Sequence, residues 1–456
     1  MDFSAANHIL WNVIIQLGIL AGSILVANGL IRSIPWFRNT LMPASVLAGF
    51  LLLLLKSLHI LNLDGDFLEI LVYHCIALGF IAMSLRVTNK EASQGAGLTG
   101  PKSGAIIVGT YLIQGITGLI ITILLAYTVM PGMFKAAGLL LPMGFGQGPG
   151  QANNVGTTYQ GMGFAGGRSF GLSIAAAGYI CACTVGVVMV NLLSRRSGPA
   201  KKARSTDDDL SVGFFQDKNE IPVSESIDKL SIQLCMVLLT YLVTFFVLKG
   251  LTSLFSSISE GLANTLNPLF WGFNFIFGSA LAMLVRYLLD RGQKWKVVEK
   301  QYQNNYLLNR LSGFFFDIMI VAGIASINIE EIKGLWLPFV LMVIAGAVVT
   351  WFYLRYVCKK VYPDYKQEGL ISMYGMLTGT IGSGILLLRE IDPDFSTPAA
   401  NNLVIGSSYG IILGAPVLIL VGLAPKSTAM CFVTLGLAAV YWALLTLFIV
   451  KAKKKK

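Results

Sequence analysis

The chain has 456 residues, of which 55% are hydrophobic and only 12% are charged, and its mean hydropathy is +0.70. So few charged side chains cannot cover a water-soluble protein of this size, which excludes a soluble enzyme or binding domain. The net charge of +11 does not indicate a nucleic-acid partner, because the basic residues lie in short loops between apolar runs. The composition predicts an all-α polytopic membrane protein whose main partner is the lipid bilayer.

The first half of the chain contains five apolar stretches long enough to cross a bilayer, a length of roughly 20 residues for a core of about 30 Å. We predict these spans at residues 8–32, 41–60, 67–86, 103–130 and 169–193. Between the fourth and fifth, residues 136–160 form two shorter apolar pieces around the glycine-rich stretch Gly144 to Gly150. Broken backbone is tolerated at membrane depth only where protein or a wet cavity surrounds it. We therefore predict a re-entrant hairpin at residues 136–160.

A long polar stretch at residues 194–228 follows, first basic and then acidic, and it predicts a cytoplasmic linker. The second half repeats the pattern, with spans predicted at residues 229–255, 265–289, 309–327, 335–357 and 400–423. A second glycine-rich hairpin is predicted at 370–387, and an extra span at 427–450 precedes a lysine-rich tail. The domains predicted are 1–193, 194–228, 229–424 and 425–456.

Most of the basic residues fall on one side when the N-terminus is placed outside, as the positive-inside rule requires. The C-terminus is then cytoplasmic, and the chain has about eleven spans. Because five is an odd number, the second set of five spans crosses in the opposite sense to the first. We therefore predict two inverted five-helix repeats, with hairpins that enter from opposite faces, plus one extra C-terminal transmembrane helix.

Glycines in the first hairpin let backbone approach a ligand closely, and the half-helix that follows presents unpaired amides to an anion. Asparagine, threonine and arginine side chains nearby add hydrogen-bond donors, and an arginine binds a carboxylate through two parallel hydrogen bonds. The alternatives are a glycine kink in a packed helix and an arginine that reaches the membrane interface. The substrate-binding residues predicted here are Gly146, Gly148, Gly150, Asn153, Asn154, Thr157 and Arg168.

The second hairpin offers hydroxyls and carbonyls that can bind a partly dehydrated sodium ion and release it again. Its predicted substrate-binding residues are Thr380, Gly382, Ser383 and Gly384. The predicted ligands of a coupling ion are Asp317, Thr378, Ser383, Asn401 and Asn402. Asp317 stands out because an ionised carboxylate in an apolar helix needs a partner. The serine and threonine residues could equally be small packing residues between helices.

Catalytic and transition-metal sites are not indicated. The six cysteines lack a zinc or disulfide spacing, and no second carboxylate is evident opposite Asp317 for intramembrane hydrolysis. We expect a protein that is not an enzyme and that uses no cofactor, with Na⁺ as its coupling ion.

Several of these motifs resemble the bacterial sodium/glutamate symporter family. They are Leu41 to Gly49, Gly79 to Leu85, the first hairpin with its fifth span, and Thr378 to Gly384. The resemblance implies sodium-coupled uptake of L-glutamate by alternating access, with an elevator-type motion. It also implies a homodimer in the bacterial cytoplasmic (inner) membrane.

The first loop departs from the family pattern, which is typically Gly-Gly-x-Gly followed by small residues. Here Gly146-Gln147-Gly148-Pro149-Gly150 precedes Gln151 to Asn154, and an extra helix is appended. The alternatives are therefore another carboxylate or amino acid, coupling to sodium or protons, and a passive channel or uniporter.

Overall fold

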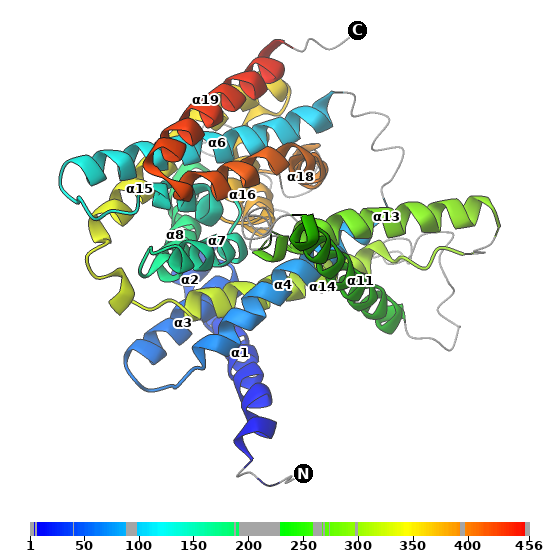
Figure 1. The fold of residues 1–456 in the computed structure, drawn as a ribbon. Helices are drawn as coiled ribbons and strands as arrows, with labels where there is room; N and C mark the ends of the chain where they lie inside the picture. The colour runs from blue at the N-terminus through cyan, green and yellow to red at the C-terminus, as the bar shows by residue number, and fades with distance from the viewer. Residues whose placement is uncertain are drawn as a thin grey trace. The chain divides into compact units, whose positions relative to one another are not determined.

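The computed structural model describes residues 4, 7–39, 41–87, 98–186, 188–190, 229–258, 267, 270–272, 274–296, 300–392 and 397–451. Every regular element among these residues is a helix, which confirms the predicted all-α class (Figure 1). The predicted linker at 194–228 and the lysine tail beyond Lys451 lie outside the described residues.

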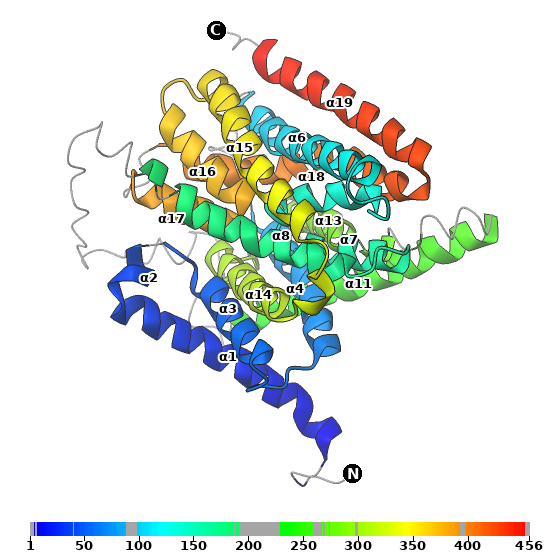
Figure 2. The ribbon, with the colours of Figure 1, turned by 90° about the vertical axis from the view of Figure 1, so that its left-hand side faces the viewer.

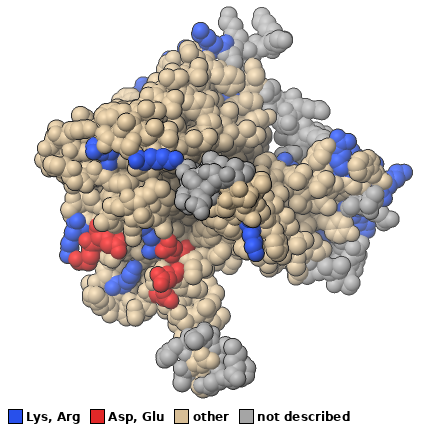
Figure 3. Space-filling model, viewed as in Figure 1, with Lys and Arg blue, Asp and Glu red and all other residues tan. Residues whose placement is uncertain are grey.

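Nine helices in the described part of the chain are long and apolar enough to cross a membrane. They are α1 (His8–Ser33), α4 (Gly65–Leu85), α6 (Thr99–Tyr127), α8 (Gly167–Cys181) with the π-turn η3 (Ala182–Gly186), α11 (Lys229–Ile258), α14 (Asn305–Ala325), α15 (Trp336–Val361), α18 (Ala399–Leu423) and α19 (Thr428–Lys451). Neutral side chains form most of the face shown in Figure 3, as a lipid-facing surface requires. The protein is a multi-pass membrane protein.

Two further predicted spans correspond to helices that do not reach this length and hydropathy. The stretch 41–60 is the shorter apolar helix α3 (Ala44–Ser57), which follows the brief α2 (Pro35–Asn39). The stretch 265–289 corresponds to α13 (Asn274–Lys294), whose second half carries Arg286, Asp290, Arg291 and Lys294. The total of eleven spans stays a prediction.

The helices group into two compact units, and each unit draws on both halves of the sequence. Unit 1 comprises Met1–Val72, Gly97–Lys202 and Ile320–Lys456, and unit 2 comprises Tyr73–Ala96 and Ala203–Met319. This grouping follows spatial contact, whereas the predicted domains follow chain order. The predicted domain limits stay predictions.

Unit 1 is built around α6, which packs against α15, α18 and α19 (Figure 1). Small residues allow the close approach. Gly104 lies against Tyr409 of α18, and Gly118 lies against the backbone of Gly138. In a membrane such packing has to supply the attraction between helices, because lipid is as apolar as the side chains themselves.

Unit 2 contains most of α4 and α14 together with α11 and α13. Its packing centres on aromatic rings, since Phe80 contacts both Phe275 and Phe316. Ser312 Oγ donates to the carbonyl oxygen of Gly79 at 3.0 Å and so joins α14 to α4. Asp317, one of the predicted ion ligands, lies exposed on α14 in this unit.

Candidate functional site

The first glycine-rich segment is a broken helix. A 3₁₀-turn, η1 (Lys135–Leu139), leads into a π-turn, η2 (Pro142–Gly146), and a new helix, α7 (Pro149–Gly161), begins three residues later. Gly148 between them has φ +85° and ψ −173°, a conformation that only glycine adopts without strain. Pro149 then starts α7 at the position where a missing amide costs no hydrogen bond. The sequence thus enforces a break at Gly148.

The second glycine-rich segment is broken in the same way. Helix α16 (Lys366–Thr378) and helix α17 (Ile381–Arg389) are separated by Gly379 and Thr380, and they pack side by side (Figure 2). A Cβ atom added to Gly384 would lie 2.5 Å from the carbonyl oxygen of Ser372. Glycine at this position is therefore what allows α17 to lie against α16.

The two breaks touch each other within unit 1. A Cβ atom added to Gly148 would lie 3.7 Å from Thr380 Cγ2, 3.8 Å from the carbonyl oxygen of Gly379 and 3.9 Å from the Tyr179 hydroxyl of α8. Gly178, also in α8, packs directly against the carbonyl oxygen of Thr378. The first turns of α7 and α17 therefore begin next to each other, beside α8.

This meeting point has two kinds of helix end. The first-turn amides of α7 and α17 have no partner within their helix, and neither helix starts with a side-chain cap. These amides form a positive end that attracts an anion. The opposite ends, where η2 stops at Gly146 and α16 stops at Thr378, present carbonyl oxygens and are negative.

Buried side chains at the breaks lack hydrogen-bond partners among the described residues. Both polar atoms of Gln151 are unpartnered although the residue is 1% exposed, and so is Ser383 Oγ, whose residue is 3% exposed. Each such group costs about 1–3 kcal/mol when it is left unsatisfied. Ser383 Oγ lies 2.9 Å from the position of a Cβ atom on Gly379, so it faces the break itself. A bound molecule would satisfy these atoms.

Gln114 of α6 stands between the two breaks, and the sequence analysis missed it. Its Nε2 donates to the carbonyl oxygen of Leu377 at 3.0 Å and to Thr350 Oγ1 at 2.8 Å. Its Oε1 lies 3.0 Å from the position of a Cβ atom on Gly146 and has no hydrogen-bond partner in the described part of the chain, while the residue is 0% exposed. A glutamine in an otherwise apolar span is the signal that could have identified it.

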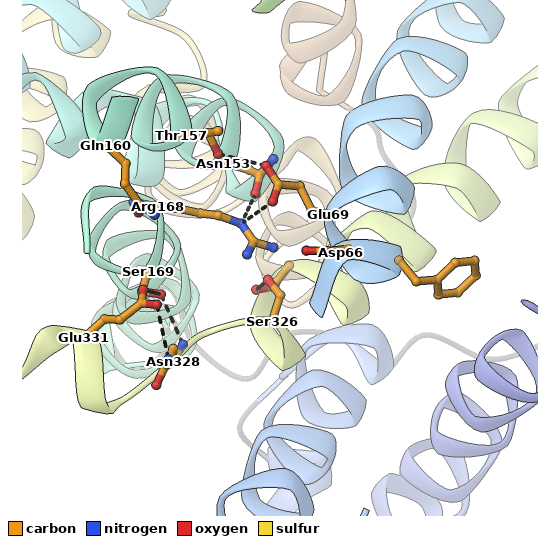
Figure 4. A network of polar contacts seen from close by, with 12 residues as sticks. Asp66, Glu69, Asn153, Thr157, Gln160, Arg168, Ser169, Ser326, Asn328 and Glu331 are labelled. Atoms are coloured by element: carbon orange, nitrogen blue, oxygen red, sulfur yellow. Dashed lines mark hydrogen bonds and ion pairs between the residues drawn. The ribbon is translucent and has the colours of Figure 1, made fainter. Parts of the chain in front are cut away.

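Three of the predicted substrate residues gather around Glu69 of α4, as Figure 4 shows. Arg168 Nε donates to Asn153 Oδ1 at 2.9 Å and lies 3.4 Å from Glu69 Oε2. Thr157 Oγ1 donates to Glu69 Oε1 at 3.1 Å. Glu69, a carboxylate near the start of a predicted span, was not among the predicted site residues.

A second carboxylate, that of Glu331, contacts Ser169, the residue that follows Arg168. Ser169 Oγ donates to Glu331 Oε2 at 2.6 Å, and Asn328 Nδ2 donates to Glu331 Oε1 at 3.2 Å (Figure 4). The Nη2 atom of Arg168 is buried and has no hydrogen-bond partner among the described residues. The head of α8 is thus held by two carboxylates, from α4 and from the turn η4 (Glu330–Ile332).

The predicted substrate residues therefore form two groups joined by α7. Asn153, Thr157 and Arg168 surround Glu69, and Asn154 is buried on the same helix. The remaining residues lie at or beside the breaks: Gly146, Gly148, Gly150, Thr380, Gly382, Ser383 and Gly384.

The predicted ion ligands are distributed over the helices α14, α16, α17 and α18. Ser383 lies at the second break, but the Thr378 hydroxyl donates to the carbonyl oxygen of Tyr374 in its own helix at 2.8 Å. Asn402 donates to the Tyr365 hydroxyl at 2.7 Å, and Asn401 is exposed at the start of α18. Asp317 belongs to unit 2. Their roles as ion ligands stay predictions.

Comparisons with known proteins give no assignment to set beside this geometry. No protein-family model matches the chain, and no curated protein matches it. What the two breaks bind has to follow from their own residues.

Proposed function

We propose that the protein is a secondary active transporter that takes up L-glutamate together with Na⁺ across the bacterial cytoplasmic membrane. The observation that carries this proposal is the contact between the two helix breaks at Gly148 and Thr380. Interrupted helices persist in a membrane where they line a protein-walled site. In secondary transporters, paired interruptions from the two halves of the chain form the substrate site.

The same proposal includes re-entrant hairpins and an inverted repeat, with the N-terminus outside. Polar contacts in unit 1 support this topology, because residues assigned to one face contact each other. Glu69 and Arg168, both assigned to the outside, form an ion pair. Ser103 and Tyr362, both assigned to the cytoplasmic side, share a hydrogen bond of 2.6 Å.

An anionic substrate fits the positive ends of the broken helices. We infer that one carboxylate of the substrate accepts hydrogen bonds from the first-turn amides of α7 and α17, next to Ser383. A membrane that is negative inside opposes entry of an anion by about 2.3 kcal/mol per charge per 100 mV. Coupling to more than one cation per monoanion turns this penalty into a driving force.

The family resemblance, the elevator-type motion and the homodimer belong to this proposal as well. The alternatives are a proton-coupled transporter, a different carboxylate or amino acid as substrate, and a passive channel or uniporter. All of these alternatives use the same broken helices. The ion gradient that drives uptake and the compounds that compete with glutamate distinguish them.

The test is uptake of labelled L-glutamate into proteoliposomes under imposed sodium, proton and voltage gradients. We expect accumulation that requires an inward sodium gradient and increases with inside-negative voltage. Uptake driven by protons alone would overturn the sodium assignment, and sodium-independent counterflow would indicate a passive pathway. Competition by dicarboxylates that lack an amino group would point away from glutamate.

A pair of glycine variants serves as the internal control for the site. Gly148→Val should abolish uptake, because valine cannot adopt the backbone conformation at the break. Gly132→Ala should transport normally, because a Cβ atom there would meet nothing within 4 Å. Normal uptake by Gly148→Val would show that the breaks do not line the pathway.

A further inference from the structure

We propose that Gln114 Oε1 is a ligand of a sodium ion bound at the carbonyl ends of the two breaks. The inference rests on the proposed function, because this ion would be the coupling ion of that transport. Gln114 lies in α6 and is not one of the ion ligands predicted from the sequence.

Hydrogen bonding fixes which way the Gln114 amide points. Both hydrogens of Nε2 are used, one on the carbonyl oxygen of Leu377 and one on Thr350 Oγ1. In the flipped amide the side-chain oxygen would face the Leu377 carbonyl oxygen, and two acceptors would repel each other. Oε1 must therefore occupy the other position, next to Gly146.

Gln114 lies where two helical pieces end. Gly146, beside Oε1, is the last residue of the π-turn η2, and Leu377, whose carbonyl oxygen accepts from Nε2, lies in the last turn of α16, an end that carries a partial negative charge. Oε1 is a fully buried acceptor without a donor among the described residues. A π-turn also disturbs the regular pairing of carbonyls, and such turns concentrate at functional sites.

The amide ends and the carbonyl ends of the helices at the breaks suit ligands of opposite charge. The amide ends begin at Pro149 and Ile381 and suit the substrate carboxylate. The carbonyl ends with Gln114 suit the cation, as in transporters whose half-helix C-termini and unwound carbonyls hold sodium. Hard, uncharged oxygen ligands hold a monovalent cation firmly enough to bind it and weakly enough to release it.

A purely structural role is the competing explanation. Gln114 would then only cap α16 through Leu377, and its oxygen would contact no ion. The two explanations differ in one measurable quantity, the affinity of the protein for sodium in the absence of substrate.

The experiment is titration calorimetry of the full-length protein in nanodiscs with sodium chloride, with choline chloride as the ionic-strength control. We expect saturable sodium binding that weakens by about tenfold or more in Gln114→Leu, as loss of a ligand predicts. Gln16→Leu is the matched control, because Gln16 is also a buried glutamine with an unpartnered oxygen but belongs to α1. It should bind sodium like the wild type. Equal affinities of Gln114→Leu and wild type would overturn the proposal.

Gln114→Glu keeps the shape of the side chain and covers the case in which Gln114→Leu fails to fold. A carboxylate beside the ion should make sodium affinity increase with pH, whereas the wild type has no ionisable ligand there. Sodium affinity equal to that of the wild type at every pH would count against the proposal.

The sodium titration separates this inference from the proposed function. Sodium binding that depends on Gln114 without glutamate uptake would leave the inference standing and remove the substrate assignment. Glutamate uptake together with sodium binding that is unchanged in Gln114→Leu would support the proposed function and overturn the inference. A wild-type protein that binds no sodium would overturn the inference.

Discussion

Gly148 and Ser383 illustrate how single residues create the junction of the breaks. Gly148 supplies a backbone conformation that ends one helical piece and starts the next, and it lies in contact with Thr380. Ser383 supplies a buried hydroxyl that has no described partner. One residue therefore provides geometry and the other provides chemistry.

Replacing Gly148 with alanine should destabilise the protein through backbone strain. The added Cβ meets its neighbours only at ordinary contact distance, so the cost of about 1–3 kcal/mol comes from the positive φ. We expect a lower melting temperature together with lost uptake. Gly163→Ala is the control, because Gly163 has φ +102° in a turn where a Cβ meets nothing within 4 Å. It should lose stability but keep uptake per folded molecule. Unimpaired uptake by Gly148→Ala would contradict the assigned role.

Glu69 and Arg168 form an ion pair whose side chains are 32% and 17% exposed, intermediate between a surface pair and a buried one. We therefore expect a coupling energy of about 1–2 kcal/mol in a double-mutant cycle of Glu69→Gln and Arg168→Gln. The measurement is denaturant unfolding of the purified single and double variants, and the coupling should shrink at high salt. A coupling of zero would mean that the pair contributes nothing to stability.

At the scale of elements, the structure shows contacts between distant helices that the local sequence does not encode. The glycine and proline content of residues 144–150 and 379–384 predicted the two breaks, because such residues disrupt a helix wherever they occur. The contact between the breaks depends on packing across more than half the chain and has no local signal. The same holds for the bonds from Gln114 to Leu377 and from Arg168 to Glu69.

The hydrogen-bond partners of the predicted ion ligands have no local signal either. Residue type made Thr378 and Asn402 candidates, and the fold decides that they donate to the Tyr374 carbonyl oxygen and the Tyr365 hydroxyl, while the oxygens of both side chains keep lone pairs that could bind an ion. Donor and acceptor inventories can be read from a sequence, but the partners are set by the fold.

Helices α16 and α17 pack so closely that Gly384→Ala should force them apart. The new Cβ would lie 2.5 Å from the backbone oxygen of Ser372, which cannot move aside as a flexible side chain could. Overpacking of this kind costs about 1–3 kcal/mol. Gly382→Ala is the control on the same helix, because its Cβ would meet only Thr380 Oγ1 at 3.5 Å. We expect a clear drop in melting temperature for Gly384→Ala and almost none for Gly382→Ala; equal effects would contradict the packing.

At the scale of the whole molecule, the topology can be tested by labelling from one side. Lys333 and Lys366 are both exposed, and the sequence assigns them to opposite faces of the membrane. In a background without the six native cysteines, Lys333→Cys should react with a membrane-impermeant maleimide in intact cells. Lys366→Cys should react only after permeabilisation. Labelling of both from outside would reject the predicted orientation.

Gln114 fastens three stretches of chain that lie far apart in sequence, α6, the end of α16 and, through Thr350, α15. Sliding of these helices past one another would break two buried hydrogen bonds and leave their polar groups unsatisfied. Under the proposed elevator-type motion, α6, α15 and the end of α16 would therefore move as one rigid body, and the stationary partner would lie among other helices.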